Sequence, residues 1–242
     1  MKKILNEVIG VLKTGHATRD KHSVKEYLWS FVKIFILVCV IRIIAMMFAG
    51  MVLHFLGIDI PENVTQTNLA EKSFLGRVLL VVILAPIIEE LATRLGLVFN
   101  IRNFVISTSL LLFYLLHYAF NKVIILDSVG GLSLTQRTII SVLYAVVMYI
   151  LLIKNDRITT VLSNFWETHK RFIFYISFLF FGYMHMFNYE LTVQNIMISP
   201  IMLSSHLIMG IFLGYARLKL GLISSIGLHA LNNSISYIKY LF

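Results

Sequence analysis

The chain has 242 residues, of which 58% are hydrophobic, and its formal net charge is +9. Its mean hydropathy is +0.84, and a soluble globular domain has an apolar share of only roughly 45 to 50%. This composition excludes a soluble domain and predicts an all-α, polytopic membrane protein. The basic residues lie in termini and loops beside apolar segments, where they set orientation and contact anionic lipid headgroups. We therefore expect the lipid bilayer, and no nucleic acid, as a partner.

The N-terminal residues 1–26 carry charges throughout and lack the apolar core of a cleavable signal peptide. We predict a basic cytoplasmic segment here. Because it has no signal-peptide core, the first membrane helix must direct insertion. Residues 27–74 are expected to hold that helix and an outer loop. Cys39 is the only cysteine of the chain, which excludes an internal disulfide and a cysteine-rich metal cluster.

Seven segments are apolar enough for a membrane-spanning helix, which needs about 20 such residues. They are residues 31–54, 75–98, 104–121, 138–153, 172–188, 194–215 and 221–238. This pattern predicts a transmembrane bundle of about seven to eight helices, with residues 75–242 as one domain. Basic loops alternate with acidic or nearly uncharged ones, which places the N-terminus in the cytoplasm. Residues 155–171 fit either an interfacial amphipathic helix or a solvated loop.

The first polar cluster lies late in the second predicted span and contains Glu89, Glu90 and Arg94. Helical spacing makes Glu90 and Arg94 i,i+4 neighbours that can form an ion pair, whereas Glu89 points about 100° away. One carboxylate is then held, and the other is free to accept a proton from water in a site of low dielectric constant. A structural ion pair that locks helices together is the alternative. Pro86 leaves a backbone carbonyl about one turn upstream without its usual donor.

Two further clusters place imidazoles on apolar helices. His185 follows Phe181 by one turn, and His229 shares a face with Asn233 on the last predicted helix. Ionisable groups at membrane depth are costly, which makes these histidines functional candidates. An imidazole and an amide on one face can both donate to a developing oxyanion. Hydrogen bonding between packed helices is the alternative for both clusters.

His117 competes with His185, because it follows Phe113 with the same spacing. His54 and His206 lie in or near helices without a carboxylate nearby in the sequence, and we give them less weight.

In this order, the motifs Glu-Glu-x-x-x-Arg, Phe-x-x-x-His and His-x-x-x-Asn resemble the CPBP family of intramembrane proteases. The family is named for CAAX proteases and bacteriocin-processing proteins and is also called the Abi family. The resemblance spans about residues 78–238, and residues 1–74 match nothing specific. The chain departs from the family at Thr93, where many members have an aromatic residue directly before the arginine. This departure leaves the ionisable set intact.

A second departure concerns the spacing of the motifs. In the family, the second motif usually follows the first after one short hairpin, which fits His117, whereas His185 comes two predicted spans later. The trailing Asn188 and the separation between His185 and His229 nevertheless resemble the family pattern more closely. Two inserted spans also preserve the direction in which the histidine-bearing helix crosses the membrane. We therefore favour His185.

The resemblance implies a hydrolytic mechanism. Glu89, helped by His185, would activate a water that attacks a peptide carbonyl. His229 and Asn233 would stabilise the oxyanion. No cofactor is required by this mechanism.

The resemblance also implies that Glu90 and Arg94 position the helix and tune Glu89. An older metalloprotease interpretation of the family would have Glu89, His185 and His229 hold zinc, an acceptable ligand set for a catalytic site with one open position. The chain has no His-Glu-x-x-His helix to support that interpretation. We therefore expect no metal, with zinc as the alternative.

The resemblance implies a peptide or small membrane-protein substrate, such as a bacteriocin, a pheromone or a leader peptide, in a bacterial plasma membrane. A role in self-immunity is related to this activity. A scaffold or immunity protein without catalysis on the same fold is the first alternative, and a small transporter is the second. Against a transporter, we find no internal repeat and no paired broken helices in corresponding halves. The oligomeric state does not follow from the sequence.

Overall fold

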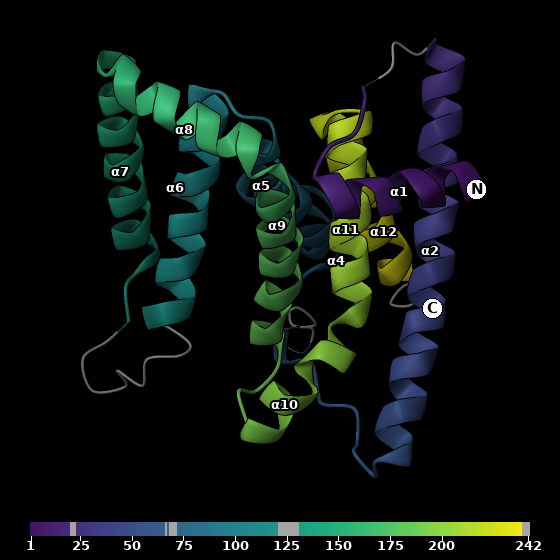
Figure 1. Ribbon diagram of the computed structural model, residues 1–242. Coiled ribbons are helices and arrows are strands. Elements are labelled where there is room, and N and C mark those ends of the chain that lie inside the picture. Colours follow the sequence, from purple (N-terminus) through teal and green to yellow (C-terminus); the bar gives the residue numbers. More distant parts are fainter. Residues whose placement is uncertain (20–22, 66, 68–71, 121–130, 239–242) are drawn as a thin grey trace.

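The computed structural model describes the chain apart from residues 20–22, 66, 68–71, 121–130 and 239–242. The described part contains helices and no β-strand, which confirms the predicted all-α class (Figure 1). In chain order the helices are α1 (Lys2–Thr14), α2 (Val24–Phe55), α4 (Phe74–Arg77), η1 (Val78–Leu84), α5 (Ala85–Thr93), η2 (Leu95–Leu97), α6 (Ile101–Tyr118), α7 (Leu134–Lys154), α8 (Asp156–Thr168), α9 (Lys170–Met184), η4 (His185–Asn188), α10 (Val193–Met202), α11 (Ser204–Lys219) and α12 (Leu222–Ile238).

Three helices, α2, α6 and α7, are long and apolar enough to cross a membrane. The pair of α10 and α11, bent by 46°, would form a fourth span. These helices occupy four of the seven segments that the sequence predicts, although residue 121, the last of one segment, lies outside the described residues. Shorter helical pieces occupy the other three, so the count of seven to eight spans stays a prediction.

Several predicted spans are interrupted, because local chemistry breaks their hydrogen-bond ladders. The span predicted at residues 194–215 bends after α10, which contains Pro200. A proline has no N–H for the carbonyl four residues earlier, and here the hydroxyl of Ser199 donates to the Ile196 carbonyl at 2.8 Å instead. The span predicted at residues 172–188 also ends early, because α9 stops at Met184 and a 3₁₀ turn follows.

The basic N-terminal segment forms a helix that the sequence analysis did not predict. Helix α1 packs against α9 and α11 and lies across α11 rather than along it (Figure 1). Its apolar face buries Ile4, Val8 and Val11 in the main core. On its polar face, Glu7 accepts a hydrogen bond of 2.5 Å from the hydroxyl of Tyr215. The charges of this segment therefore occupy one face of an amphipathic helix.

Residues 156–168 form helix α8, so the helical alternative for this segment is the one observed. Asn155 caps it by accepting a hydrogen bond of 3.1 Å from the backbone N–H of Ile158. The helix lies across the ends of α7 and α9 (Figure 1). Trp166 anchors it, because its indole N–H donates to the Gly96 carbonyl at 2.7 Å. Its ring lies edge-on to Phe104, with a centroid separation of 5.4 Å.

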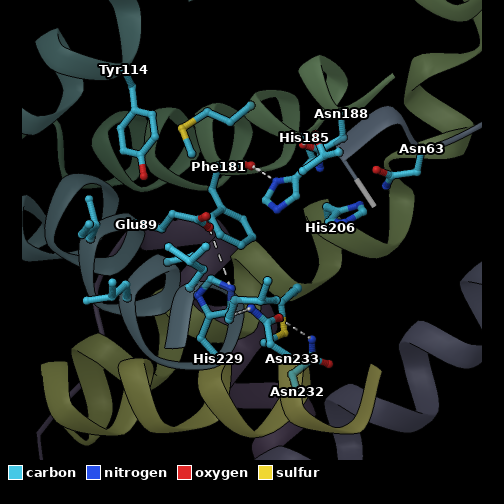
Figure 2. A pocket seen from close by; sticks show the side chains of 18 of the residues that line it. Asn63, Glu89, Tyr114, Phe181, His185, Asn188, His206, His229, Asn232 and Asn233 are labelled. Atoms are coloured by element: carbon cyan, nitrogen blue, oxygen red, sulfur yellow. Dashed lines mark hydrogen bonds and ion pairs between the residues drawn. The ribbon is translucent and has the colours of Figure 1, made fainter. Parts of the chain in front are cut away.

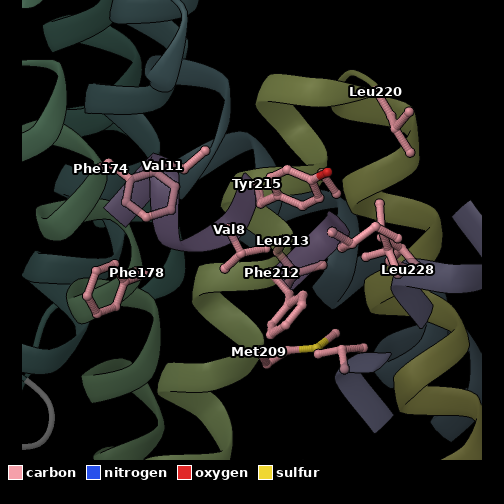
Figure 3. Packing of buried hydrophobic residues seen from close by; sticks show 14 of the residues in the cluster. Val8, Val11, Phe174, Phe178, Met209, Phe212, Leu213, Tyr215, Leu220 and Leu228 are labelled. Carbon is pink, nitrogen blue, oxygen red and sulfur yellow. The ribbon is translucent and has the colours of Figure 1, made fainter. Parts of the chain in front are cut away.

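The main core surrounds α11, which packs against α2, α9 and α12 (Figure 3). Phe174, Phe212, Leu213 and Tyr215 are almost completely buried there. Gly214 permits the close approach of α9, since a Cβ atom at this position would lie 2.7 Å from a ring carbon of Phe174. This tight packing fixes the helices on which the polar clusters lie.

Candidate active site

Helix α5 carries the two adjacent carboxylates and turns them in different directions. Glu90 is fully buried, and both of its oxygens are engaged. One oxygen lies 3.5 Å from Nε of Arg94 and accepts a hydrogen bond from the hydroxyl of Ser225. The other accepts a hydrogen bond of 3.1 Å from Nδ1 of His229. We call these four residues the ion-pair knot.

Arg94 connects the knot to the neighbouring helices. Its guanidinium donates to the Gly210 carbonyl of α11 at 3.2 Å and to the hydroxyl of Thr93. The central carbon of the guanidinium lies 4.0 Å from the centroid of the Phe181 ring on α9, a cation–π arrangement. Arg94 is completely buried, so its charge is balanced by Glu90 alone within the knot. This arrangement matches the structural ion pair considered for this motif, but only for one of its two carboxylates.

Glu89 lies outside the knot and faces a cavity of about 550 Å³. Its side chain is 16% exposed, and within the described part of the chain its Oε2 atom accepts no hydrogen bond. The same atom lies 3.8 Å from Nε2 of His229 (Figure 2). His185 and Asn233 line the same cavity. The structure therefore brings together the four side chains to which the resemblance assigns catalytic roles.

His229 lies between the two carboxylates. Its Nδ1 donates to Glu90, which fixes a proton on that nitrogen and leaves Nε2 facing Glu89. The edge of its ring packs against Phe181, with a centroid separation of 5.3 Å and an angle of 82° between the rings. These contacts hold the imidazole in one orientation at the cavity wall.

The side chain of Asn233 donates a hydrogen bond to the backbone of the helix segment that precedes the carboxylates. Residues 78–84 form a π-helix, in which each N–H bonds to the carbonyl five residues earlier. Pro86 lies two residues after its end and has no N–H to offer the Val81 carbonyl. The side-chain amide of Asn233 donates to that carbonyl at 2.9 Å. The carbonyl that the proline was expected to leave without its usual donor thus has a partner, and one amide hydrogen of Asn233 stays available for the cavity.

This contact makes a testable prediction about stability. We expect Asn233→Ala to lower the free energy of unfolding by about 1 kcal/mol, because the half-buried Val81 carbonyl loses its donor. The loss should shrink in a Pro86→Ala background, where the backbone regains an N–H at position 86. Unfolding of the four variants in detergent, analysed as a double-mutant cycle, measures the coupling. Additive effects of the two substitutions would contradict this account.

The sequence pattern predicts His185 inside a helix. In the structure, His185 begins the 3₁₀ turn η4 instead. Its Nδ1 donates to the Phe181 carbonyl at 2.8 Å, so Nε2 is left as the acceptor of the neutral ring. The Phe181 ring lies between the two site histidines, with a centroid separation of 5.0 Å from His185 (Figure 2). No hydrogen bond or ion pair joins His185 directly to Glu89 within the described residues. The competing His117 is not among the side chains that line the cavity; its neighbours on α6, Tyr114 and Tyr118, are.

Residues 157–235 match the family model of the type II CAAX prenyl endopeptidase, Rce1-like. This match confirms the resemblance to the CAAX protease family. The matched segment contains His185, His229 and Asn233, and it begins after His117 and the acidic cluster. At the level of the family, it indicates an intramembrane protease that acts on a peptide. No curated protein and no solved structure matches the chain.

The sequence pattern did not predict two of the residues that line the cavity. His206 stacks on His185 with a ring separation of 4.2 Å, and it lines the cavity (Figure 2). The bend between α10 and α11 places it there, and the sequence signal for that bend is Pro200. Arg42 also lines the cavity from α2. An arginine in the middle of an apolar span was the available signal for it.

The zinc alternative depends on three side chains of the site. Glu89, His185 and His229 supply a carboxylate and two imidazoles, which are donors that zinc accepts. Within the described residues, however, no group of three histidine, cysteine, aspartate or glutamate side chains is positioned to hold a metal ion. The absence of a metal stays a prediction with zinc as the alternative, and no step of the proposed mechanism is routed through a metal.

Proposed function

We propose that this protein is an intramembrane endopeptidase in which Glu89 and histidines activate water for attack on a peptide bond. The observation that carries the proposal is the difference in environment between the two adjacent carboxylates. Both oxygens of Glu90 have partners in the ion-pair knot, whereas Glu89 faces a cavity that it shares with His185 and His229. A structural ion pair alone needs one carboxylate, and the Oε2 atom of the second accepts no hydrogen bond within the described residues.

In the proposed mechanism, a water molecule binds in the cavity between Glu89 and His185. The neutral His185 ring holds its proton on Nδ1, so Nε2 accepts a hydrogen bond from the water and orients it. Glu89 takes the other proton as the water oxygen attacks the carbonyl carbon. The protonated Glu89 then donates that proton to the departing amine, so protons balance over the cycle.

The negative charge that develops on the carbonyl oxygen needs donors that are already in place. Asn233 holds its amide toward the cavity through the Val81 contact and keeps one hydrogen available. His229, which lies between the two carboxylates at the cavity wall, serves as the second donor when its ring carries a proton on both nitrogens. The knot with Arg94 keeps this ring and the helix of Glu89 in register.

The proposed substrate is an extended or locally unwound segment, because helical peptide bonds are already hydrogen-bonded and shielded. A cavity of about 550 Å³ lies in the size range of ligand sites. By analogy with the family, we propose a small membrane-associated or secreted peptide, in processing of a bacteriocin, pheromone or leader or in related self-immunity. The proposed location is a bacterial plasma membrane, with the N-terminus in the cytoplasm.

Comparison of His185→Ala with His117→Ala tests the choice of the second site histidine. We expect His185→Ala to lower cleavage by a factor of about 10²–10⁴, the usual contribution of a group that assists proton transfer. We expect His117→Ala to leave cleavage unchanged, since His117 does not line the cavity. The measurement is comparative membrane proteomics at matched expression, which follows a small peptide or membrane protein whose cleavage product disappears.

The proteomic comparison also separates the enzyme from a scaffold. Loss of the same product in His185→Ala and Glu89→Ala cells, but not in His117→Ala cells, would support proteolysis and identify the substrate. An unchanged peptide pattern together with an intact cellular phenotype in all three variants would favour a scaffold or immunity role without catalysis. Loss in His117→Ala cells alone would show that our choice of histidine is wrong.

A further inference from the structure

The cavity holds a cation that the proposed mechanism does not use. Arg42 lies in the middle of α2, and its side chain lines the cavity together with the site histidines. Its Nε donates to the hydroxyl of Ser205 at 2.9 Å, and Nη1 donates to the side-chain oxygen of Asn232. Nη1 also lies 4.0 Å from the sulfur of Met209. These contacts fix the guanidinium between α2, α11 and α12.

Arg42 has hydrogen-bond partners but no counterion. Within the described part of the chain, no aspartate or glutamate side chain lies within 4.0 Å of its nitrogen atoms. A charged side chain at membrane depth normally pairs with an opposite charge or marks a functional pathway. Arg94, in contrast, is paired with Glu90. Arg42 therefore retains an unbalanced positive charge at the cavity wall.

The charge of the cavity as a whole points in the same direction. Its charged lining residues are two arginines, Arg42 and Arg77, and one carboxylate, Glu89. Among the described side chains of this lining, Glu89 is therefore the one carboxylate. Both N–H groups of Nη2 in Arg42 make no hydrogen bond within the described residues. A guanidinium with a free pair of donors is suited to a carboxylate.

We propose that Arg42 determines specificity by binding a carboxylate of the substrate peptide. This inference rests on the proposed function, because it places the carboxylate relative to the scissile bond. Arg42 contacts Asn232, which lies one turn of α12 beyond His229 and beside Asn233. A carboxylate on Nη2 would therefore belong to a residue close to the scissile bond, on the α2 side of the cavity. It comes either from the C-terminus of the peptide or from an aspartate or glutamate side chain.

A binding experiment tests this proposal without relying on catalysis. The full-length protein carrying Glu89→Gln, in nanodiscs of zwitterionic lipid, is titrated against three pools of N-terminally labelled, random apolar decapeptides. The first pool has a free C-terminal carboxylate, the second is amidated, and the third is amidated with one internal aspartate. Fluorescence anisotropy gives the affinity of each pool. The same titrations are made after adding Arg42→Met, Arg42→Lys or Arg137→Met.

Arg137→Met is the matched control. Arg137 is a buried arginine on α7 whose guanidinium lies 5.1 Å from the centroid of the Phe113 ring. It is not among the residues that line the cavity. Its removal should change stability without changing the preference for a carboxylate.

We expect at least one carboxylate pool to bind about tenfold more tightly than the neutral amidated pool, the usual gain from a charge-assisted hydrogen bond. The ratio should fall to about one in Arg42→Met, fall partly in Arg42→Lys, and persist in Arg137→Met. Which pool binds more tightly identifies the source of the carboxylate. Equal affinities of all three pools before Arg42 is changed, or an unchanged ratio in Arg42→Met, would overturn the proposal. A lower melting temperature with an unchanged ratio would make Arg42 a structural link only.

The outcome is separable from the fate of the proposed function. If the preference depends on Arg42 but the protein with Glu89 intact cleaves none of the pools, Arg42 binds a carboxylate and the endopeptidase proposal fails. If cleavage occurs with no preference for a carboxylate, the endopeptidase proposal stands and the role of Arg42 is wrong.

Discussion

Glu89→Gln is expected to lower peptide cleavage by a factor of about 10²–10⁴, the range that a positioned general base contributes. The amide keeps the size and shape of the side chain but cannot take a proton from water. Because the Oε2 atom of Glu89 accepts no hydrogen bond within the described structure, the free energy of unfolding should fall by less than it does in Glu90→Gln. Initial cleavage rates and thermal unfolding of the purified protein measure the two effects.

Glu90→Gln is the control for this prediction, because it changes the adjacent carboxylate in the same way. Glu90 is fully buried in the ion-pair knot, so its neutralisation leaves the Arg94 charge unbalanced and should lower stability first. A Glu89 variant that unfolds while retaining its activity per folded molecule would contradict the assignment. A Glu89 variant with the full cleavage rate would show that another group accepts the proton.

The division between the two carboxylates was predictable because it depends only on local geometry. On a helix, i,i+4 spacing sets Glu90 against Arg94 and turns Glu89 away. Both features hold in the structure, where Glu90 pairs with Arg94 and Glu89 faces the cavity. The effect of Pro86 on the carbonyl upstream was predictable for the same reason, although its partner, Asn233, lies 152 positions away in the sequence.

Features that depend on how distant helices meet were not predictable from the pattern. His206 has no carboxylate near it in sequence, and only the bend after α10 stacks it on His185. Ser225 resembles any small polar residue on an apolar helix, yet its hydroxyl donates to the buried Glu90. The many charged residues of α1 made this helix difficult to predict from the sequence. These residues lie on one face, while Val11 and its apolar neighbours pack into the core. Tertiary packing decides each of these cases.

Arg94→Met is expected to be the most destabilising single substitution in the site. It keeps the length of the side chain but leaves the Glu90 carboxylate buried without its cationic partner. Removal of one partner from a buried ion pair typically costs about 3–5 kcal/mol. The contacts of the guanidinium with Gly210 and Phe181 are lost as well. Thermal or denaturant unfolding in detergent, together with the amount of folded protein in the membrane, measures the loss.

The double variant Glu90→Gln/Arg94→Met distinguishes loss of charge balance from loss of packing. If the uncompensated carboxylate is the main cost, neutralising Glu90 as well should recover a large part of the lost stability, because replacement of a whole buried pair is often nearly neutral. If stability stays as low as in Arg94→Met, the contacts of Arg94 with α9 and α11 carry the effect. In the first case, the stable double variant would allow cleavage to be measured without the ion-pair knot. Because Glu90 orients His229 through Nδ1, we expect the recovered protein to fold but to cleave its substrate more slowly than the wild type.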